Sequence, residues 1–125
     1  MAGEQILVVE DNEMNMKLLR DVLYATGYRT LEATTGAEAV ELASSNVPDL
    51  VLMDIQLPDF DGVQALHRLR ANERTAAIPV LAVTAQAMQG DRQEFLAAGF
   101  DGYVSKPVNV RELIGTLRQY CDDRD

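Results

Sequence analysis

Acidic side chains follow two short apolar runs of the sequence, and their carboxylates could act together at one site. Glu10 and Asp11 directly follow the apolar run at residues 6–9, and Asp54 directly follows the run at residues 50–53. If the two runs are neighbouring parallel strands, three carboxylates meet at one edge of a sheet. Two like charges about 4 Å apart repel each other by on the order of 4 kcal/mol at an effective dielectric near 20. Such a group needs a proton, wide separation or a bound cation, and these oxygen ligands suit Mg²⁺.

A hydroxyl and a lysine follow two later apolar runs. Thr84 comes after residues 79–83, and Lys106 comes after residues 102–105. Lys106 is one of only two lysines, with Lys17, in a chain that otherwise uses arginine. Thr84 alone is a weak signal, because threonine is common in strands. Together with the carboxylates, a positive charge and a hydroxyl donor are what a phosphoryl group requires.

Not every acidic residue here has the same meaning. An aspartate after a strand is most often a turn or helix-cap residue, and we interpret Asp59 and Asp61 in that way. Asp54 differs because it ends an apolar run directly, and helix-cap chemistry begins only at Asp61. Asp54 is therefore the candidate for chemistry.

The elements that would position these residues alternate along the chain. The runs at 6–9, 50–53 and 79–83 are continuously apolar, which is typical of parallel strands buried on both faces, and weaker runs at 29–33 and 102–105 suit outer strands. Amphipathic stretches separate them. This alternation predicts an α/β doubly wound domain, whose ligands bind beyond the carboxyl ends of the strands.

Helix boundaries are marked by capping residues. Thr35, Asp61 and Asn109 each stand three residues before a glutamate or glutamine, which is the capping-box pattern. Gly27 and Gly99 follow helical segments and suit left-handed positions at helix ends.

Length and charge exclude several classes of protein. The 125 residues suffice for one domain, residues 1–125, and we expect no output domain. The net charge of −9 argues against nucleic-acid and anionic-membrane partners. The amino terminus resembles neither a signal peptide nor a membrane span. The single cysteine, Cys121, fits a reducing compartment, so we expect a cytoplasmic protein.

Competing catalytic motifs are missing from the sequence. It contains neither glycine-rich phosphate-binding motif and no Cys/His cluster for zinc. The only histidine, His67, falls in the middle of a predicted helix, far from the strand ends. The sequence therefore argues against hydrolase chemistry.

Four segments, in order and at this spacing, resemble the receiver domains of two-component response regulators. They are VVEDN (8–12), MDIQLPDFDG (53–62), VTA (83–85) and YVSKP (103–107). The resemblance covers essentially the whole chain and lies closest to stand-alone DivK-type regulators, although receivers of hybrid kinases share similar segments. It implies the CheY-like, flavodoxin-like (βα)5 fold, with a parallel sheet of order 2-1-3-4-5.

The resemblance also implies an acceptor and a metal site. Asp54 would take a phosphoryl group from a phosphohistidine of a histidine kinase or histidine phosphotransfer protein. Mg²⁺ would bind Asp11 and Asp54 directly, with Glu10 acting through water and Gln56 offering its backbone carbonyl. Glu10 replaces the aspartate often found at this position, and we expect a modest change in metal geometry.

The same resemblance implies a conformational change on phosphorylation. Lys106 would contact the phosphoryl oxygens, Thr84 would hydrogen-bond the phosphoryl group, and Tyr103 would swing inward as Thr84 moves. The Lys106–Pro107 bond would be cis. The helix within residues 86–98, the strand at 102–105 and the last helix would form the face that binds a downstream protein. The domain would catalyse only its own phosphorylation and dephosphorylation, so we do not expect an enzyme in the usual sense.

Three further interpretations stay open at this point. A receiver-like module that binds partners without phosphorylation is the main alternative, and a Mg²⁺-dependent phosphatase would share the acidic cluster.

The first helix has an apolar arc of roughly 200°, twice the minimum for a packed stripe. That arc is explained by deep burial, or by Met14 and Leu18 docking the phosphodonor.

Overall fold

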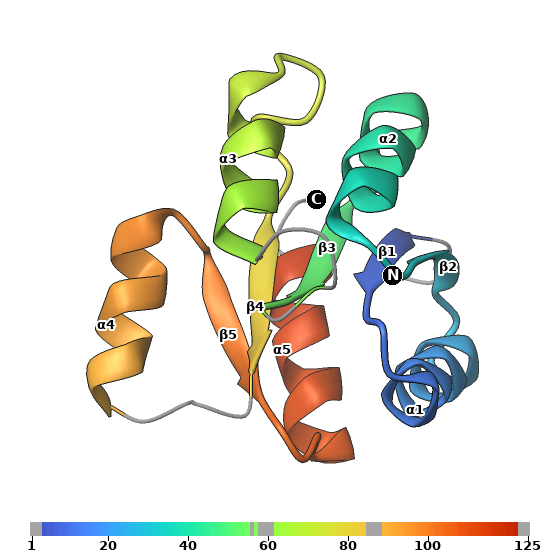
Figure 1. Cartoon of the computed structure of the whole chain (residues 1–125). Coiled ribbons are helices and arrows are strands. Elements are labelled where there is room, and N and C mark those ends of the chain that lie inside the picture. The colour runs from blue at the N-terminus through green and yellow to red at the C-terminus, as the bar shows by residue number, and fades with distance from the viewer. Residues whose placement is uncertain (1–3, 56, 58–61, 85–88, 123–125) are drawn as a thin grey trace.

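The described part of the chain forms five strands and five helices in strict alternation (Figure 1). In this computed structural model the described residues are 4–55, 57, 62–84 and 89–122. The strands are β1 (Gln5–Val9), β2 (Arg29–Ala33), β3 (Leu50–Asp54), β4 (Val80–Thr84) and β5 (Gly102–Ser105). The helices are α1 (Glu13–Ala25), α2 (Gly36–Asn46), α3 (Gly62–Ala71), α4 (Gln89–Ala98) and α5 (Val110–Asp122).

All strands are parallel and lie in the order β2-β1-β3-β4-β5. Every residue of β3 and β4 is buried, whereas the edge strands β2 and β5 are only partly buried. The α/β doubly wound fold and the sheet order expected from the sequence are confirmed. Because β1 and β3 pair directly, their carboxyl ends are adjacent.

Two apolar clusters, one on each face of the sheet, hold the layers together. On one face, buried residues of α1 and α5 such as Leu19, Leu23 and Leu117 pack against alternate residues of the central strands. On the other face, α2 and α3 contribute buried residues such as Ala43 and Leu69. The continuous apolar runs follow from this arrangement, since odd and even residues of one strand serve different clusters.

Caps mark the helix ends largely as predicted. The Thr35 and Asn109 side chains accept hydrogen bonds from the backbone N–H groups three residues later, at 3.1 Å in both cases. The reciprocal half of the first capping box differs, because the Glu38 carboxylate accepts from the backbone of Thr34 rather than Thr35. The predicted cap at Asp61 lies outside the described residues. Asn12, which the sequence analysis did not single out, caps α1.

Other local expectations are also met. Gly27 and Gly99 have φ values of 92° and 115°, which are left-handed. The Lys106–Pro107 peptide bond is cis. His67 is exposed on α3. Among the described residues, no helix combines the length and the apolar character needed to cross a membrane.

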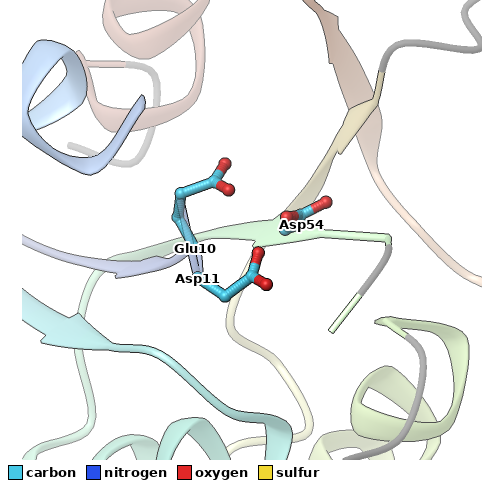
Figure 2. Close-up of side chains that lie close together, drawn as sticks. All are labelled: Glu10, Asp11 and Asp54. Carbon is cyan, nitrogen blue, oxygen red and sulfur yellow. The ribbon is translucent and has the colours of Figure 1, made fainter. Parts of the chain in front are cut away.

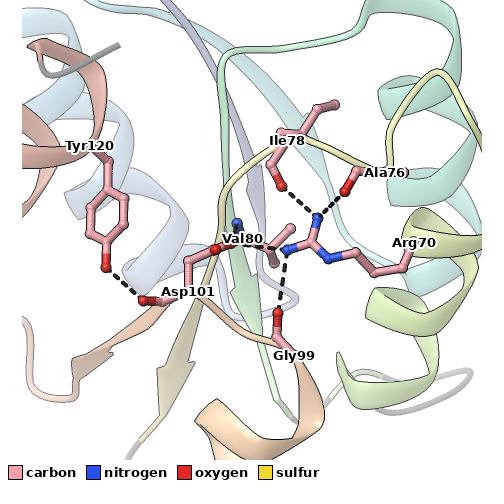
Figure 3. A network of polar contacts seen from close by, with 7 residues as sticks. All are labelled: Arg70, Ala76, Ile78, Val80, Gly99, Asp101 and Tyr120. Carbon is pink, nitrogen blue, oxygen red and sulfur yellow. Dashed lines mark hydrogen bonds and ion pairs between the residues drawn. The ribbon is translucent and has the colours of Figure 1, made fainter.

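A polar network fastens the amino-terminal edge of the sheet (Figure 3). The Arg70 guanidinium, on α3, donates to the carbonyl oxygens of Ala76, Ile78 and Gly99 and to the Asp101 carboxylate. The same carboxylate oxygen accepts from the Val80 N–H at 2.8 Å. On the other side, the Tyr120 hydroxyl of α5 donates to the Asp101 carbonyl at 2.7 Å. The network thus joins α3, α5 and the starts of β4 and β5.

Candidate functional site

The carboxyl edge of the sheet carries the residues that the sequence placed at strand ends. Glu10 follows β1, with its N–H donated to the Ala33 carbonyl at 3.0 Å. Asp54 is the last residue of β3. Thr84 is the last residue of β4, and Lys106, just after β5, donates its N–H to the Thr84 carbonyl at 2.8 Å. Backbone hydrogen bonds therefore fix the points from which these side chains start.

Three carboxylates gather at this edge, as expected (Figure 2). Glu10, Asp11 and Asp54 each offer one oxygen, and these atoms all lie within 4.8 Å of one another. Glu10 and Asp54 are buried, whereas Asp11 is exposed. They line a hollow of about 390 Å³, with Lys106 on its wall and Asn15 among the other lining residues. The hollow is large enough for a small charged group together with water.

Lys106 reaches both buried carboxylates. Its Nζ lies 3.0 Å from Glu10 Oε1 and 3.4 Å from Asp54 Oδ2. Glu10 Oε1 is fully buried, and its contact with Nζ is an ion pair without well-directed hydrogen-bond geometry. Among the described residues of this hollow, Lys106 is the one cation and faces two buried carboxylates, with Asp11 as a third acid, which leaves an excess of negative charge.

The pKa values of the two partners reflect that excess. Burial raises the pKa of the Glu10 carboxyl above its ordinary value and the Asp54 charge adds to the rise, although contact with Lys106 opposes it. Burial by itself would lower the pKa of the Lys106 ammonium. The contact with Glu10 and the charge of Asp54 outweigh that effect, so the pKa is raised and Lys106 stays charged. The site favours added positive charge.

The two switch candidates lie farther along the edge. Thr84 is buried at the end of β4. Tyr103, in β5, is half-buried and packs against the core cluster that includes residues of α2 and α3. Gln56, whose backbone carbonyl was expected to bind the metal, lies outside the described residues. The pairing of β4 with β5 puts Tyr103 opposite Ala82, two residues before Thr84.

Gly62 is a site residue that the sequence analysis missed. A Cβ built on Gly62 would lie 2.6 Å from the Asp54 carbonyl oxygen and 3.0 Å from the Ile55 Cα. The Gly62 N–H donates to the Ile55 carbonyl at 2.8 Å. Any side chain here would displace the backbone that carries Asp54. The Asp61–Gly62 pair ends the 53–62 segment of the resemblance and was a signal for it, but we gave a role only to Asp61, as a helix cap.

The apolar arc of α1 divides into two parts. Met16, Leu19, Val22 and Leu23 are buried, and Leu18 is half-buried against the same core. Met14 is different, because 83% of its surface is exposed. Burial therefore explains most of the arc, and Met14, in the first turn of α1, is the member that stays exposed.

Comparison with known proteins assigns this arrangement to a family. The sequence model of the response regulator receiver domain matches residues 6–118. The chain belongs to the response regulator receiver family. As a receiver, it is a component of two-component signal transduction, in which Mg²⁺ and phosphoaspartate are typical.

Named relatives place this receiver more closely. It is 45% identical over 120 residues to the polar-differentiation response regulator DivK of Brucella ovis, across 96% of this chain and 98% of that protein. The same identity and coverage hold for DivK of Brucella suis. The receiver is thus of the CheY-like, DivK type, as the sequence motifs indicated.

Solved receiver structures agree with the fold. The receiver domain of the sensor histidine kinase PA1611 from Pseudomonas aeruginosa, with a magnesium ion in its active-site cleft, has a TM-score of 0.89, with 39% identity over 97% of this chain and 99% of that one. The Saccharomyces cerevisiae complex of the phosphotransfer protein Ypd1 with the receiver domain of Ssk1 also has a TM-score of 0.89, with 27% identity over 98% of this chain and 92% of that one.

Proposed function

We propose that this receiver accepts a phosphoryl group on Asp54 from a phosphohistidine. The observation that carries the proposal is the position of Asp54 itself. Its carboxylate ends the fully buried strand β3, lies 3.4 Å from the Lys106 ammonium, and opens into the hollow shared with Glu10 and Asp11. A carboxylate held by its backbone, next to a cation and open on one side, is suited to be a nucleophile.

Mg²⁺ is the cofactor that the donor set fits. Glu10, Asp11 and Asp54 supply only oxygen, and Glu10 Oε1 is buried without a well-directed hydrogen bond. Hard cations of this size prefer such ligands and keep several of their waters. When bound, Mg²⁺ neutralises negative charge between the carboxylates and the phosphoryl oxygens. The magnesium ion in the cleft of the similar PA1611 receiver supports this assignment. Glu10 acting through water and the Gln56 carbonyl remain parts of the proposal.

The chemical step follows from the placement of these residues. An oxygen of Asp54 attacks the phosphorus atom of the phosphohistidine, the P–N bond breaks, and the imidazole leaves with the electron pair. Lys106 Nζ, already 3.4 Å from Asp54, balances charge on the phosphoryl oxygens. The Thr84 hydroxyl donates to a phosphoryl oxygen once the group is in place. Hydrolysis of the aspartyl phosphate by water transfers the phosphoryl group to water, which returns the free carboxylate and releases inorganic phosphate.

Phosphorylation then shifts a two-state equilibrium rather than creating a new state. Movement of Thr84 toward the phosphoryl group vacates space that the half-buried Tyr103 ring fills. We expect the change to appear on the face formed by α4, β5 and α5, which binds the downstream protein. The described α4 side chains Gln93, Glu94 and Leu96 are exposed on this helix and available to a partner. An unchanged backbone there after phosphorylation would contradict this part.

The donor is a histidine kinase or a histidine phosphotransfer protein. The Ypd1–Ssk1 complex shows a receiver of this fold bound to a phosphotransfer protein, which supports such a partner here. We place the protein in the cytoplasm, where the buried Cys121 suits a reducing environment. We expect neither nucleic acid nor membrane among its partners, because the net charge is −9.

A phosphorylation-independent binding module is the competing function. The complete set of Glu10, Asp11, Asp54, Thr84 and Lys106 argues against it, since a site that had lost its chemistry would not need them all. A phosphatase acting on external substrates would need binding insertions, and the connections between elements leave little room for them. We therefore propose a switch that catalyses only its own phosphorylation and dephosphorylation, and not an enzyme in the usual sense.

Phosphotransfer from a purified phosphohistidine protein tests the function. A histidine phosphotransfer protein carrying labelled phosphate is mixed with wild type or Asp54→Asn in the presence of Mg²⁺. The proposal predicts transfer of label to wild type and none to the variant. Stable binding of the donor to both proteins, with transfer to neither, would favour the phosphorylation-independent module.

A further inference from the structure

Lys106 spans the carboxyl edge of the sheet to reach Glu10. Lys106 follows β5 and Glu10 follows β1, and the strands β4 and β3 lie between them. Neighbouring strands are about 4.8 Å apart, so the two strand ends are separated by roughly 14 Å. Both side chains must be long to close that span, and Nζ and Oε1 meet at 3.0 Å. Asp54 lies between them on β3, and its Oδ2 is 3.4 Å from Nζ.

Glu10 is fixed independently of Lys106. Its second carboxylate oxygen, Oε2, accepts from the Asn12 N–H at 3.2 Å, and its own N–H is held by the Ala33 carbonyl. Only 1% of the Glu10 side chain is exposed, against 19% for Lys106. The carboxylate is therefore the fixed partner in this ion pair, and the ammonium is the partner whose position is chosen.

We propose that Glu10 is a positioning residue that holds the Lys106 ammonium beside Asp54, where the phosphoryl group arrives. The inference rests on the proposed role of Asp54 as acceptor and gives Glu10 a task separate from metal binding. A lysine has a flexible four-carbon stem, so an unheld ammonium samples many positions. Held between two carboxylates, it is already in place before the phosphoryl group enters, and no reorganisation is needed during the step.

The extra methylene of glutamate is what makes this contact possible. Aspartate at position 10 would withdraw the carboxylate by up to about 1.5 Å, one carbon–carbon bond length. The 3.0 Å contact with Nζ would then open beyond ion-pair range unless the backbone moved. Reach, rather than charge alone, is therefore the property that the inference assigns to Glu10.

Two variants separate reach from charge. Glu10→Asp keeps the negative charge but loses the reach, whereas Glu10→Gln keeps the reach and an acceptor oxygen but loses the charge. If Glu10 serves only as a carboxylate near the metal, Glu10→Gln is the more harmful change. If Glu10 positions Lys106, Glu10→Asp is the more harmful change.

Lysine side-chain NMR measures the contact directly, without phosphate or metal. The chain has two lysines, so a protein labelled with ¹³C-lysine gives two ε-methylene signals. Lys17 is the internal reference, because 72% of its side chain is exposed, and Lys17→Arg assigns the pair. An immobilised lysine shows distinct shifts for its two ε protons, and a freely rotating one does not. The inference predicts distinct shifts for Lys106 in wild type, kept in Glu10→Gln and collapsed in Glu10→Asp.

The rate of phosphorylation at saturating Mg²⁺ is the second readout. Acetyl phosphate is the donor, and the half-saturating Mg²⁺ concentration is measured separately from the limiting rate. We expect the limiting rate to fall about tenfold or more in Glu10→Asp and less in Glu10→Gln. An unchanged circular dichroism spectrum shows that each variant is folded.

The inference is overturned if Lys106 keeps its distinct shifts in Glu10→Asp, if Glu10→Gln is perturbed at least as strongly, or if only the Mg²⁺ requirement changes. A wild-type protein that takes up no phosphoryl group would instead end the proposed function. In that case the lysine spectra would still show whether Glu10 holds Lys106.

Discussion

Arg70 Nη2 lies 2.9 Å from Asp101 Oδ2, at the edge of the sheet opposite the acidic cluster. The pair joins α3 to the start of β5, and the same guanidinium also holds the Gly99 carbonyl at the end of α4. The Arg70 side chain thus ties the end of α4 and the segment before β5 to α3, and Tyr120 of α5 joins them through its hydrogen bond to the Asp101 carbonyl. Movement of that face is expected to be smallest here.

Removing this guanidinium is therefore expected to destabilise the fold. Arg70→Ala removes the guanidinium donor from three carbonyl oxygens and from the Asp101 carboxylate, which keeps only the Val80 N–H, and should lower the free energy of unfolding by about 2 kcal/mol. Arg70→Lys should recover only part of the loss, because an ammonium lacks the planar fork. Urea denaturation measures both.

Arg74→Ala is the matched control for that series. Arg74 is also an arginine near the end of α3, but its guanidinium donates to a single carbonyl, that of Ser44. Its removal should lower the free energy of unfolding by less than about 1 kcal/mol. Equal losses in the free energy of unfolding for Arg70→Ala and Arg74→Ala would show that the network contributes no more stability than a single hydrogen bond.

Met14 is expected to contact the protein phosphodonor. Its side chain is exposed beside the acidic edge, so Met14→Ala should slow phosphotransfer from a phosphohistidine protein by about tenfold, or about 1.4 kcal/mol. Acetyl phosphate makes no such contact, and its reaction should not change. The phosphorylation rates of wild type and Met14→Ala with each of the two donors test this contact.

Tyr24 provides the control on the same helix. It is 84% exposed, as Met14 is 83% exposed, but it lies near the other end of α1, about 15 Å away. Tyr24→Ala should leave both rates unchanged. Equal slowing of both donors by Met14→Ala would count against docking.

Val47 carries backbone strain that a substitution should relieve. It follows α2 with φ 47° and ψ 67°, a left-handed conformation that disfavours a β-branched side chain. Val47→Asn should raise the free energy of unfolding by about 1 kcal/mol, since asparagine tolerates this region. Val110→Asn, at an equally exposed valine, is the control and should change stability by less than about 0.5 kcal/mol. A thermal melt that ranks the two variants equally would contradict the assignment.

The ion pair between Arg20 and Glu32 should give stability a defined pH dependence. The hydrogen bond from Arg20 holds the pKa of the Glu32 carboxyl below its ordinary value of 4.5. A lowered folded-state pKa contributes stability that is present above the unfolded pKa and is lost as pH falls through the folded one. Glu32→Gln should therefore be less stable than wild type at pH 7, with the difference shrinking below pH 4.5. A difference that grew toward acid would reverse the sign of this argument.

The sequence predicted the site better than it predicted what supports the site. Asp54 was identifiable because it ends an apolar run directly, well before the next helix cap, and Lys106 because it is one of two lysines in a chain that otherwise uses arginine. The Arg70 network was not, since it depends on carbonyl groups of loops that only the folded chain brings together. The strain at Val47 was equally hidden, because valine is among the last residues expected in a left-handed position. The strand order came from the family resemblance rather than from periodicity, which does not specify which strands pair.

Glu10 was also only partly predictable from the sequence. Its acidic character and its place after β1 predicted a member of the carboxylate cluster, and the structure brings it there. Its contact with Lys106 joins the first and last strands of the chain, and no local pattern reports such a contact. Gln56 and Asp61, which the sequence also singled out, lie outside the described residues.

Intact-mass measurement with acetyl phosphate tests the central claim, that Asp54 is the phosphoryl acceptor, most directly. Wild type and Asp54→Asn are incubated with and without Mg²⁺, and the modified residue is mapped by peptide sequencing. The account predicts one phosphoryl group on wild type, located at Asp54, dependent on Mg²⁺ and absent from the variant. A phosphoryl group on the variant, or none on wild type with either acetyl phosphate or a phosphohistidine donor, would contradict it.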